Sequence, residues 1–430
     1  MWLCLLGLLA WAPVAWAASF EFWYSHSGST AQAVLQLCEG FNASQQQHRV
    51  RCVMPGSYEQ TMQKTIAAYR AGQQPALVEI YDVGTLDMML SGAIVPVFRL
   101  MAQNGYRIDW QDYLTAVRSY YAGADDEFYS LPFNVSTAVL YANLARLRAA
   151  GVTQTPRTWR ELELAASKLK AAGEACPLVS DFNPWILLEQ VSTIEGAAIA
   201  TRDNGHAGLD ARYRFDRGVH LRFMEDVMRW WRQHLIVPAA ATRTGRHTLA
   251  FTTGECAMVL DSTSAWQVIG QSALEQVDVQ PLPVYVEGQR HSSVPGGASL
   301  WVMKGFKADV YAAVAAFIAY LQQPDKQVLL ACQTGYLPVT RSAAALIAAT
   351  GNTCPAAINA GIRSLNPPQG LASHGPRLGF FPQLRQAWSE EVQVALADRQ
   401  DMPTALARAR QRGDRLLQRF MQTYPDTPPP

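Results

Sequence analysis

Strand and helix patterns alternate between residues 20 and 83, and no other feature of the sequence limits the possible folds as strongly. The predicted elements are a strand at 20–24, a helix at 30–41, a strand at 48–54, a helix at 58–69 and a strand at 76–83. The last strand is almost continuously apolar, which is typical of a strand buried on both faces in a parallel sheet. This alternation predicts the α/β class, in which helices cover a mostly parallel sheet.

One long extended stretch at residues 131–141 breaks this rhythm in mid-chain. A strand of that length can run from one lobe into another. The chain has 430 residues, of which 49% are hydrophobic, and that length exceeds what one compact core of ordinary size holds. We therefore expect two lobes joined by more than one crossing strand, since the sequence has no low-complexity linker.

The rest of the chain continues to mix helices and strands. A capping-box pattern marks the start of one helix, because the Thr158 hydroxyl and the Glu161 carboxylate can bond the free N–H groups there. The further predicted elements are helices at 219–234, 309–321 and across most of 382–424, and strands at 256–260, 277–282 and 300–303. Both lobes are therefore expected to be of the α/β class.

The first residues predict export from the cytoplasm. Residues 2–12 form an apolar run, and residues 15–17, Ala-Trp-Ala, form a small-x-small cleavage pattern. Together they predict a secretory signal peptide at residues 1–17. No later apolar run reaches the roughly 18–20 residues that a membrane span needs. We therefore expect a soluble product outside the cytoplasm.

Six cysteines remain after the predicted signal peptide, which contains Cys4. They are Cys38, Cys52, Cys176, Cys256, Cys332 and Cys354. An even number in an oxidising compartment permits disulfides. The nearest pairs in sequence are 38 with 52 and 332 with 354, but spacing does not fix the pairing, and buried free thiols remain an alternative.

The sequence argues against several classes of function. The 36 basic and 35 acidic residues leave a net charge of +1, whereas a nucleic-acid-binding protein carries a basic excess or stripe. There is no H-E-x-x-H, C-x-x-C, G-x-S-x-G or G-x-x-x-x-G-K-[ST] motif. Residues 261–264, Asp-Ser-Thr-Ser, read as a strand-to-helix cap rather than as a catalytic group. We therefore predict no enzyme, no metal site and no cofactor, and instead a ligand-binding module with a cleft.

Seven short motifs then occur in a fixed order along the chain. They lie at residues 56–60, 81–85, 132–137, 254–258, 296–303, 334–338 and 377–385. With these motifs in register over nearly the whole mature chain, the sequence resembles the glycerol-3-phosphate-binding proteins of bacterial ABC importers, within the family-1 extracellular solute-binding proteins.

The resemblance implies a type II periplasmic binding protein fold, in which two α/β lobes close on a ligand about a hinge. The implied lobes are an N-lobe of residues 18–134 plus 278–330 and a C-lobe of residues 135–277 plus 331–430. It also implies a monomer in the periplasm that captures sn-glycerol-3-phosphate, with glycerophosphodiesters such as glycerophosphocholine as further candidates. The expected partners are a membrane permease and its ATPase subunit.

Carried over motif by motif, the resemblance implies eight ligand-binding residues. They are Tyr58, Asp82, Ser136, Trp185, Ser262, Gly297, Tyr336 and Arg385. The chemistry suits a phosphate ester, because Arg385 offers a planar fork for two phosphate oxygens and the hydroxyls of Tyr58 and Tyr336 add donors. An ionised Asp82 can only accept hydrogen bonds, so it suits glycerol hydroxyls and repels phosphate.

Three other positions would shape the cleft. Ser262 stands at an expected helix start, where backbone N–H groups favour anions. Gly297 would let the backbone approach the ligand without a side chain, and Trp185 would stack on its carbon skeleton or head group. The chain departs from the family's pattern at Asp82, where the family has Glu, and at Phe182, where it has Trp.

Two other functions are compatible with the same features. One is a receptor for sugars or oligosaccharides on this scaffold, for which we expect more carboxylates and aromatic rings in the cleft and no buried arginine. The other is an exported glycerophosphodiester hydrolase, which would need metal-binding carboxylates and histidines. Binding of maltose would favour the first, and release of choline from glycerophosphocholine would favour the second.

Overall fold

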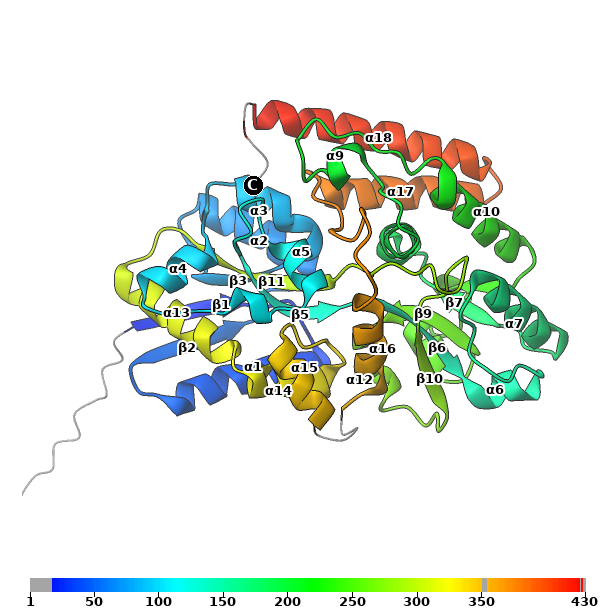
Figure 1. The fold of residues 1–430 in the computed structure, drawn as a ribbon, viewed down its shortest axis with the longest axis horizontal. Helices are drawn as coiled ribbons and strands as arrows, with labels where there is room; N and C mark the ends of the chain where they lie inside the picture. Colours follow the sequence, from blue (N-terminus) through cyan, green and yellow to red (C-terminus); the bar gives the residue numbers. More distant parts are fainter. Residues whose placement is uncertain (1–17, 350–353, 426, 428–430) are drawn as a thin grey trace, which may run out of the picture.

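The strands form two separate sheets, one in each lobe of an elongated molecule (Figure 1). The computed structural model describes residues 18–349, 354–425 and 427. The predicted signal peptide and Cys4 lie outside the described residues. The α/β class and the two-lobed architecture that the sequence predicted are confirmed.

The first sheet has the strand order β2-β1-β3-β11-β4, and β5 pairs with β11. Its strands are β1 (Ala18–Trp23), β2 (His48–Val53), β3 (Leu77–Tyr81), β4 (Ile94–Val95), β5 (Leu131–Ser136) and β11 (Gly296–Met303). β1 is parallel to β2 and β3, while β11 runs antiparallel to its neighbours. The predicted parallel arrangement therefore holds for the first three strands.

Helices enclose the first sheet. They are α1 (Gly28–Ser44), α2 (Tyr58–Arg70), α3 (Thr85–Leu90), α4 (Val97–Gln103), α5 (Thr115–Tyr121), α13 (Ala308–Leu321), α14 (Pro324–Thr334) and α15 (Arg341–Ala349). The face of α1 that the sequence predicted is buried at Val34, Leu37 and Phe41. α2 begins where a capping box of Ser57 and Gln60 satisfies its first N–H groups.

The second sheet has the order β10-β6-β9-β7-β8. Its strands are β6 (Ala138–Asn143), β7 (Leu178–Ser180), β8 (Ile236–Pro238), β9 (Met258–Ser262) and β10 (Val277–Pro281). Its helices are α6 (Leu144–Ala149), α7 (Trp159–Ala171), α8 (Val191–Ile194), α9 (Thr201–Asn204), α10 (Gly218–Arg232), α11 (His247–Thr252), α12 (Trp266–Ile269), α16 (Ala356–Leu365), α17 (Phe381–Leu396) and α18 (Met402–Thr423). The capping box of Thr158 and Glu161 forms at α7 as predicted.

The predicted extended stretch does pass from one lobe to the other. It is divided at Thr137, before which β5 pairs with β11 of the first sheet and after which β6 pairs with β9 and β10 of the second. The chain returns to the first lobe between β10 and β11 and leaves it again after α15. Several crossings of this kind allow the lobes to move about a hinge while limiting how far one lobe can shift relative to the other.

The structure divides the chain differently from the predicted lobe boundaries at two places. Residues 277–281 pair with β6 and so belong to the second sheet, although the prediction began the return to the N-lobe at residue 278. α14 packs beside α1, α15 packs on α14, and the Ser342 backbone N–H donates to Asp112, so residues 331–349 lie with the first lobe. The prediction missed this because α14 buries its apolar residues against the core of the first lobe, and the sequence pattern does not show which core a helix packs against.

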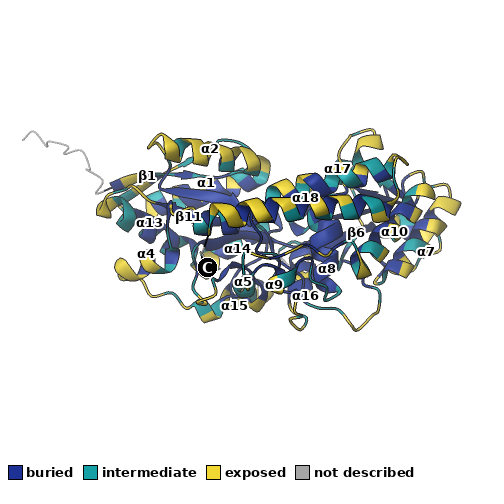
Figure 2. Ribbon diagram, turned by 90° about the horizontal axis from the view of Figure 1, so that it is seen from above, coloured by how far each residue is buried: buried dark blue, intermediate teal, exposed yellow. Residues whose placement is uncertain are grey.

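Three disulfides link the six cysteines. They join Cys38 to Cys52, Cys176 to Cys256 and Cys332 to Cys354. The free-thiol alternative is therefore not what the structure shows. In both lobes the central strands are buried, and many of the exposed residues lie on the outer faces of the helices (Figure 2). Within the part of the chain that the structure describes, no helix combines the length and apolar character of a membrane span.

Candidate ligand-binding site

Arg385 on α17 of the second lobe reaches across to the first lobe. Its Nε and Nη2 atoms donate to the two carboxylate oxygens of Glu189 over 2.6 and 2.7 Å, and Nη2 also donates to Asp82 Oδ2 over 2.9 Å. Asp82 follows β3 in the first lobe, whereas Glu189 lies on the short helix Trp185–Gln190 of the second. The Arg385 side chain is only 17% exposed, so this group is largely withdrawn from water.

The charges of this group support one another electrostatically. Burial alone would lower the pKa of Arg385, but the carboxylates of Asp82 and Glu189 raise it above its ordinary value. Burial raises the pKa of Glu189, and the guanidinium opposes that rise. Among the described residues, none accepts a hydrogen bond from Nη1 of Arg385, so one edge of its fork remains available.

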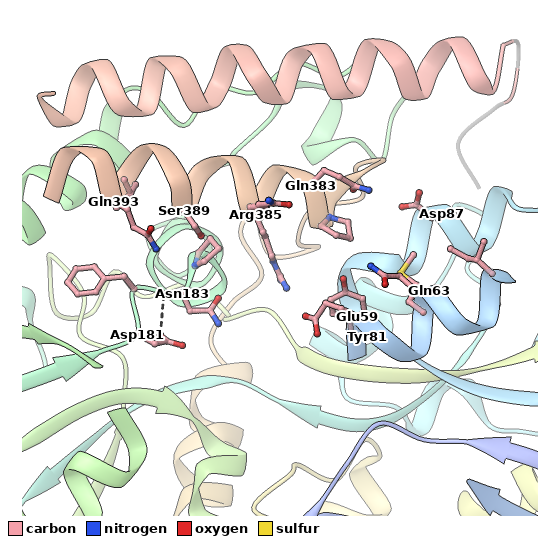
Figure 3. A pocket seen from close by; sticks show the side chains of 17 residues that line it. Glu59, Gln63, Tyr81, Asp87, Asp181, Asn183, Gln383, Arg385, Ser389 and Gln393 are labelled. Carbon is pink, nitrogen blue, oxygen red and sulfur yellow. Dashed lines mark hydrogen bonds between the residues drawn. The ribbon is translucent and has the colours of Figure 1, made fainter. Parts of the chain in front are cut away.

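A cavity of about 590 Å³ opens beside Arg385 (Figure 3). α2 and Tyr81 of the first lobe form one side, α17 forms another, and residues 181–184 form the end. Arg385 points from α17 into this space. Phe182 and the carboxylates of Glu59, Asp87 and Asp181 also line it, so the cavity combines aromatic surface with acidic groups.

Tyr58 and Tyr336 lie around a histidine that sequence reasoning did not select. The ring of His26 lies 5.3 Å from that of Tyr58 and 5.8 Å from that of Tyr336. The Asn134 side-chain amide donates to the Tyr58 hydroxyl over 2.8 Å. Burial raises the pKa of both tyrosines, so their hydroxyls stay protonated near neutral pH and can donate hydrogen bonds.

Glu79 anchors the same cluster from β3. It is fully buried, and its Oε2 accepts from the Ser25 backbone N–H over 2.7 Å while its Oε1 lies 2.7 Å from His26 Nε2. The nearly continuous apolar pattern of β3 gave no sign of this role, and all five residues of the strand are buried. A buried carboxylate requires such partners, since an unpaired charge in the interior is costly.

Ser136 and Ser262 each stand at the end of a strand, one in each of the two sheets. The Ser262 hydroxyl accepts from the Ser264 backbone N–H and lies 2.9 Å from the Ser264 hydroxyl, as the predicted cap at a helix start requires. Ser136 ends β5 and is buried, and among the described residues its hydroxyl has no hydrogen-bond partner. These hydroxyls come from both lobes.

Gly297 and Trp185 meet where β11 begins. Gly297 has φ +98°, and a Cβ there would lie 2.0 Å from the Asn134 carbonyl oxygen. The close approach of β5 and β11 therefore already requires glycine, whatever binds nearby. The Trp185 ring covers the adjacent Gly296, and among the described residues its buried Nε1 has no hydrogen-bond partner.

Four of the eight predicted residues thus fall in two groups rather than one. Arg385 and Asp82 contact each other directly, and the two tyrosines share the His26 cluster. The main residues that sequence reasoning missed are His26, Glu79, Asn134 and Glu189. Asn134 lay inside one of the motifs, but Glu189 follows an apolar helical run and His26 lies in a loop, so neither stood out.

The chemistry of this arrangement is that of recognition. It offers a guanidinium edge, tyrosine and serine hydroxyls, and carboxylates that can accept from hydroxyl groups. Within residues 18–349 and 354–425, no group of three or more His, Cys, Asp or Glu side chains is placed to hold a metal ion.

Comparison with known proteins places the chain in a family. The sequence profile described as "Bacterial extracellular solute-binding protein" matches residues 36–356. The sn-glycerol-3-phosphate-binding periplasmic protein UgpB of Yersinia enterocolitica is 34% identical over 98% of this chain and 97% of its own. The UgpB protein of Salmonella typhimurium is also 34% identical, over 94% of this chain and 93% of its own.

Solved structures share the fold at lower sequence identity. The GacH receptor of Streptomyces glaucescens superposes with a TM-score of 0.78 at 19% identity, covering 93% of this chain and 98% of its own. UgpB of Mycobacterium tuberculosis in complex with glycerophosphocholine has a TM-score of 0.77 at 20% identity, with the same coverage. The chain therefore belongs to the family of bacterial extracellular solute-binding proteins and is a binding protein, not an enzyme.

Proposed function

We propose that this chain is the periplasmic solute-binding subunit of an ABC importer for sn-glycerol-3-phosphate and for glycerophosphodiesters such as glycerophosphocholine. It captures the ligand between its lobes as a monomer and delivers it to a membrane permease powered by an ATPase subunit. Residues 1–17 act as the signal peptide that exports it. The names of relatives that are 34% identical over nearly the whole chain support this ligand class.

The position of Arg385 is the observation that carries the proposal. Glu189 holds one edge of its guanidinium, which fixes the plane of the fork, and Nη1 remains for the oxygens of a phosphate group. Tyr58, Tyr336 and Ser262 supply neutral donors to the same group. Neutral donors suit a phosphate well, because they bind the anion without adding a positive charge that the empty cleft would have to compensate.

The carboxylate beside Arg385 gives the ligand a direction. Asp82 repels phosphate oxygens and accepts from hydroxyls, so the glycerol end lies toward Asp82 and the phosphate lies on the Nη1 side. Trp185 covers the carbon skeleton, Ser136 offers a free hydroxyl, and Gly297 keeps the backbone close. The acidic and aromatic lining of the cavity next to Arg385 suits a cationic head group on a phosphodiester.

Isothermal titration of the mature protein tests this assignment. We expect heat of binding with sn-glycerol-3-phosphate or glycerophosphocholine and none with maltose. Arg385→Gln should weaken binding at least about 100-fold, since a charged, desolvated contact is lost. Arg232→Gln is the matched control, because this arginine pairs with Asp398 on the exposed surface.

Three results would overturn the proposal. They are tight binding of maltose, no binding of either phosphate compound, and unchanged affinity in Arg385→Gln. Release of choline from glycerophosphocholine would instead favour the hydrolase.

A further inference from the structure

His26 occupies the centre of the tyrosine cluster, in the loop between β1 and α1. Its Nε2 atom lies 2.7 Å from Glu79 Oε1, 2.7 Å from the Asn134 side-chain amide nitrogen and 3.4 Å from the Tyr58 hydroxyl. Three protein groups therefore surround this one ring nitrogen. A ring nitrogen has a single in-plane position for a proton or a lone pair, so Nε2 has nothing left to offer a ligand.

The other ring nitrogen is in the opposite situation. Among the described residues, Nδ1 of His26 has no hydrogen-bond partner. This atom is not fully buried, unlike the unpartnered polar atoms of the interior. It therefore keeps access to solvent although the His26 side chain is only 10% exposed. The rings on either side belong to Tyr58 and Tyr336, two of the predicted ligand-binding residues.

Glu79 determines how the ring is held. A carboxylate that accepts from one imidazole nitrogen fixes the ring's orientation and keeps a proton on that nitrogen. Nδ1 of the neutral ring then accepts a hydrogen bond from a ligand hydroxyl, while Nδ1–H of the imidazolium donates to a phosphate oxygen. Either way the ligand gains a polar contact from the first lobe in addition to the guanidinium of Arg385 from the second.

We propose that His26 is a ligand-contacting residue that acts through Nδ1, and that Glu79 is its positioning residue. This inference rests on the proposed function of the same cleft and adds a first-lobe contact to it. The ionisable groups that face His26 are Glu79 from β3, Tyr58 from α2 and Tyr336 from the loop after α14.

Two substitutions distinguish the contribution of Nδ1 from that of Nε2. The terminal atoms of asparagine lie as far from Cβ as Nδ1 does, whereas those of glutamine reach the region of Nε2. His26→Asn should therefore keep part of the ligand contact and lose the link to Glu79, and His26→Gln should do the reverse. The exposed His234, whose φ of +51° asparagine tolerates, provides the control His234→Asn.

Isothermal titration with sn-glycerol-3-phosphate and glycerophosphocholine, paired with thermal unfolding, reads out the result. We expect His26→Gln to weaken binding about 10- to 100-fold, His26→Asn to weaken it by less than about 10-fold, and His234→Asn to leave it unchanged. Glu79→Gln should weaken binding in the wild type and weaken it no further in His26→Asn, which has already lost the link to Glu79.

The outcomes distinguish this inference from the proposed function. If the wild type binds neither compound, the proposed function fails and this inference fails with it. If the wild type binds and both His26 variants retain its affinity while folded, only the His26 contact is overturned. Equal losses in the two variants, or a larger loss in His26→Asn, would assign His26 a packing role through Nε2 and overturn the contact through Nδ1.

Discussion

Nη2 of Arg385 donates to Oδ2 of Asp82 over 2.9 Å and so links the second lobe directly to the first. The bond spans 303 positions of sequence. Glu189 shares the guanidinium, which leaves two carboxylates around one cation in a largely buried group. Charges in such a group depend on each other, because each would be costly if left unpaired.

The first prediction concerns the stability of this group. Arg385→Ala removes the cation that Asp82 and Glu189 share, so we expect the free energy of unfolding to fall by about 3–5 kcal/mol. Urea denaturation followed by circular dichroism measures it. Arg232→Ala, at an exposed pair with Asp398, should change the free energy by less than about 1 kcal/mol. Equal effects of the two substitutions would contradict the argument.

The second prediction concerns lobe closure. Asp82→Asn removes the charge of the first-lobe partner, and a hydrogen bond between charged groups contributes about 1.5–3 kcal/mol. The ligand-free protein should then open, which small-angle scattering detects as a larger radius of gyration. Asp126→Asn, which affects an ion pair within the first lobe, should leave the radius unchanged. An unchanged radius in Asp82→Asn would mean that other contacts hold the lobes together.

Much of the fold was accessible from local sequence patterns. The sequence predicted several elements to within a few residues, among them the strands at 20–24 and 48–54 and the helix at 58–69. It could do so because the spacing of apolar residues and the capping residues reflect local structure. The break between β5 and β6 at Thr137 was not predicted, because a chain that passes from one sheet to the next keeps the same extended backbone on both sides. The lobe boundaries depend on whether α14 and α15 pack on the core of the first lobe or of the second. The spacing of apolar residues along a helix does not show which core it packs on.

The site was accessible only in part, and for a different reason. Arg385 and Asp82 were selected by resemblance to a family, and nothing local to either residue indicates the other. Glu189 and Glu79 are acidic residues inside apolar segments, where their roles depend on partners far away in sequence. Cys176 and Cys256 also pair across 80 residues, which spacing could not favour.

The third prediction follows from the backbone at Gly297. In Gly297→Ala the new Cβ would lie 2.0 Å from the Asn134 carbonyl oxygen, so β5 and β11 must separate. Gly288→Ala is a matched control, because Gly288 also has a positive φ, of +86°, but has nothing within 4 Å of an added Cβ. We expect Gly297→Ala to lose about 1–3 kcal/mol more stability than the control, the usual cost of overpacking. Similar losses in both would show that only the φ matters.

The fourth prediction compares two disulfides. In the chain-entropy account, a cross-link stabilises more when it closes a longer loop, from about 3 kcal/mol for 15 residues to about 4.7 kcal/mol for 100. Cys176–Cys256 spans 80 residues and Cys38–Cys52 spans 14. Replacing both cysteines by serine should therefore cost about 1.5 kcal/mol more at the first pair than at the second. A larger loss at Cys38–Cys52 in urea denaturation would reject loop entropy as the dominant effect here.

The fifth prediction is a pH dependence that arises at His247. Burial lowers the pKa of this histidine, but its ion pair with Asp261, at 3.1 Å, outweighs burial and raises the pKa from 6.5 to about 9. The folded state thus holds a proton that the unfolded state releases above about pH 6.5. The stabilisation is complete below that pH and is lost as the pH rises through about 9.

The measurement is the difference between two urea titrations as a function of pH. Other groups also titrate in this window, so the wild-type curve alone is not decisive. His247→Gln should lose stability relative to the wild type at pH 6, and the gap should close as the pH approaches 9. Asp261→Asn should shrink the same gap, because the imidazolium loses its partner. A gap that persists unchanged to pH 9 would mean that His247 stabilises the fold by packing rather than by its charge.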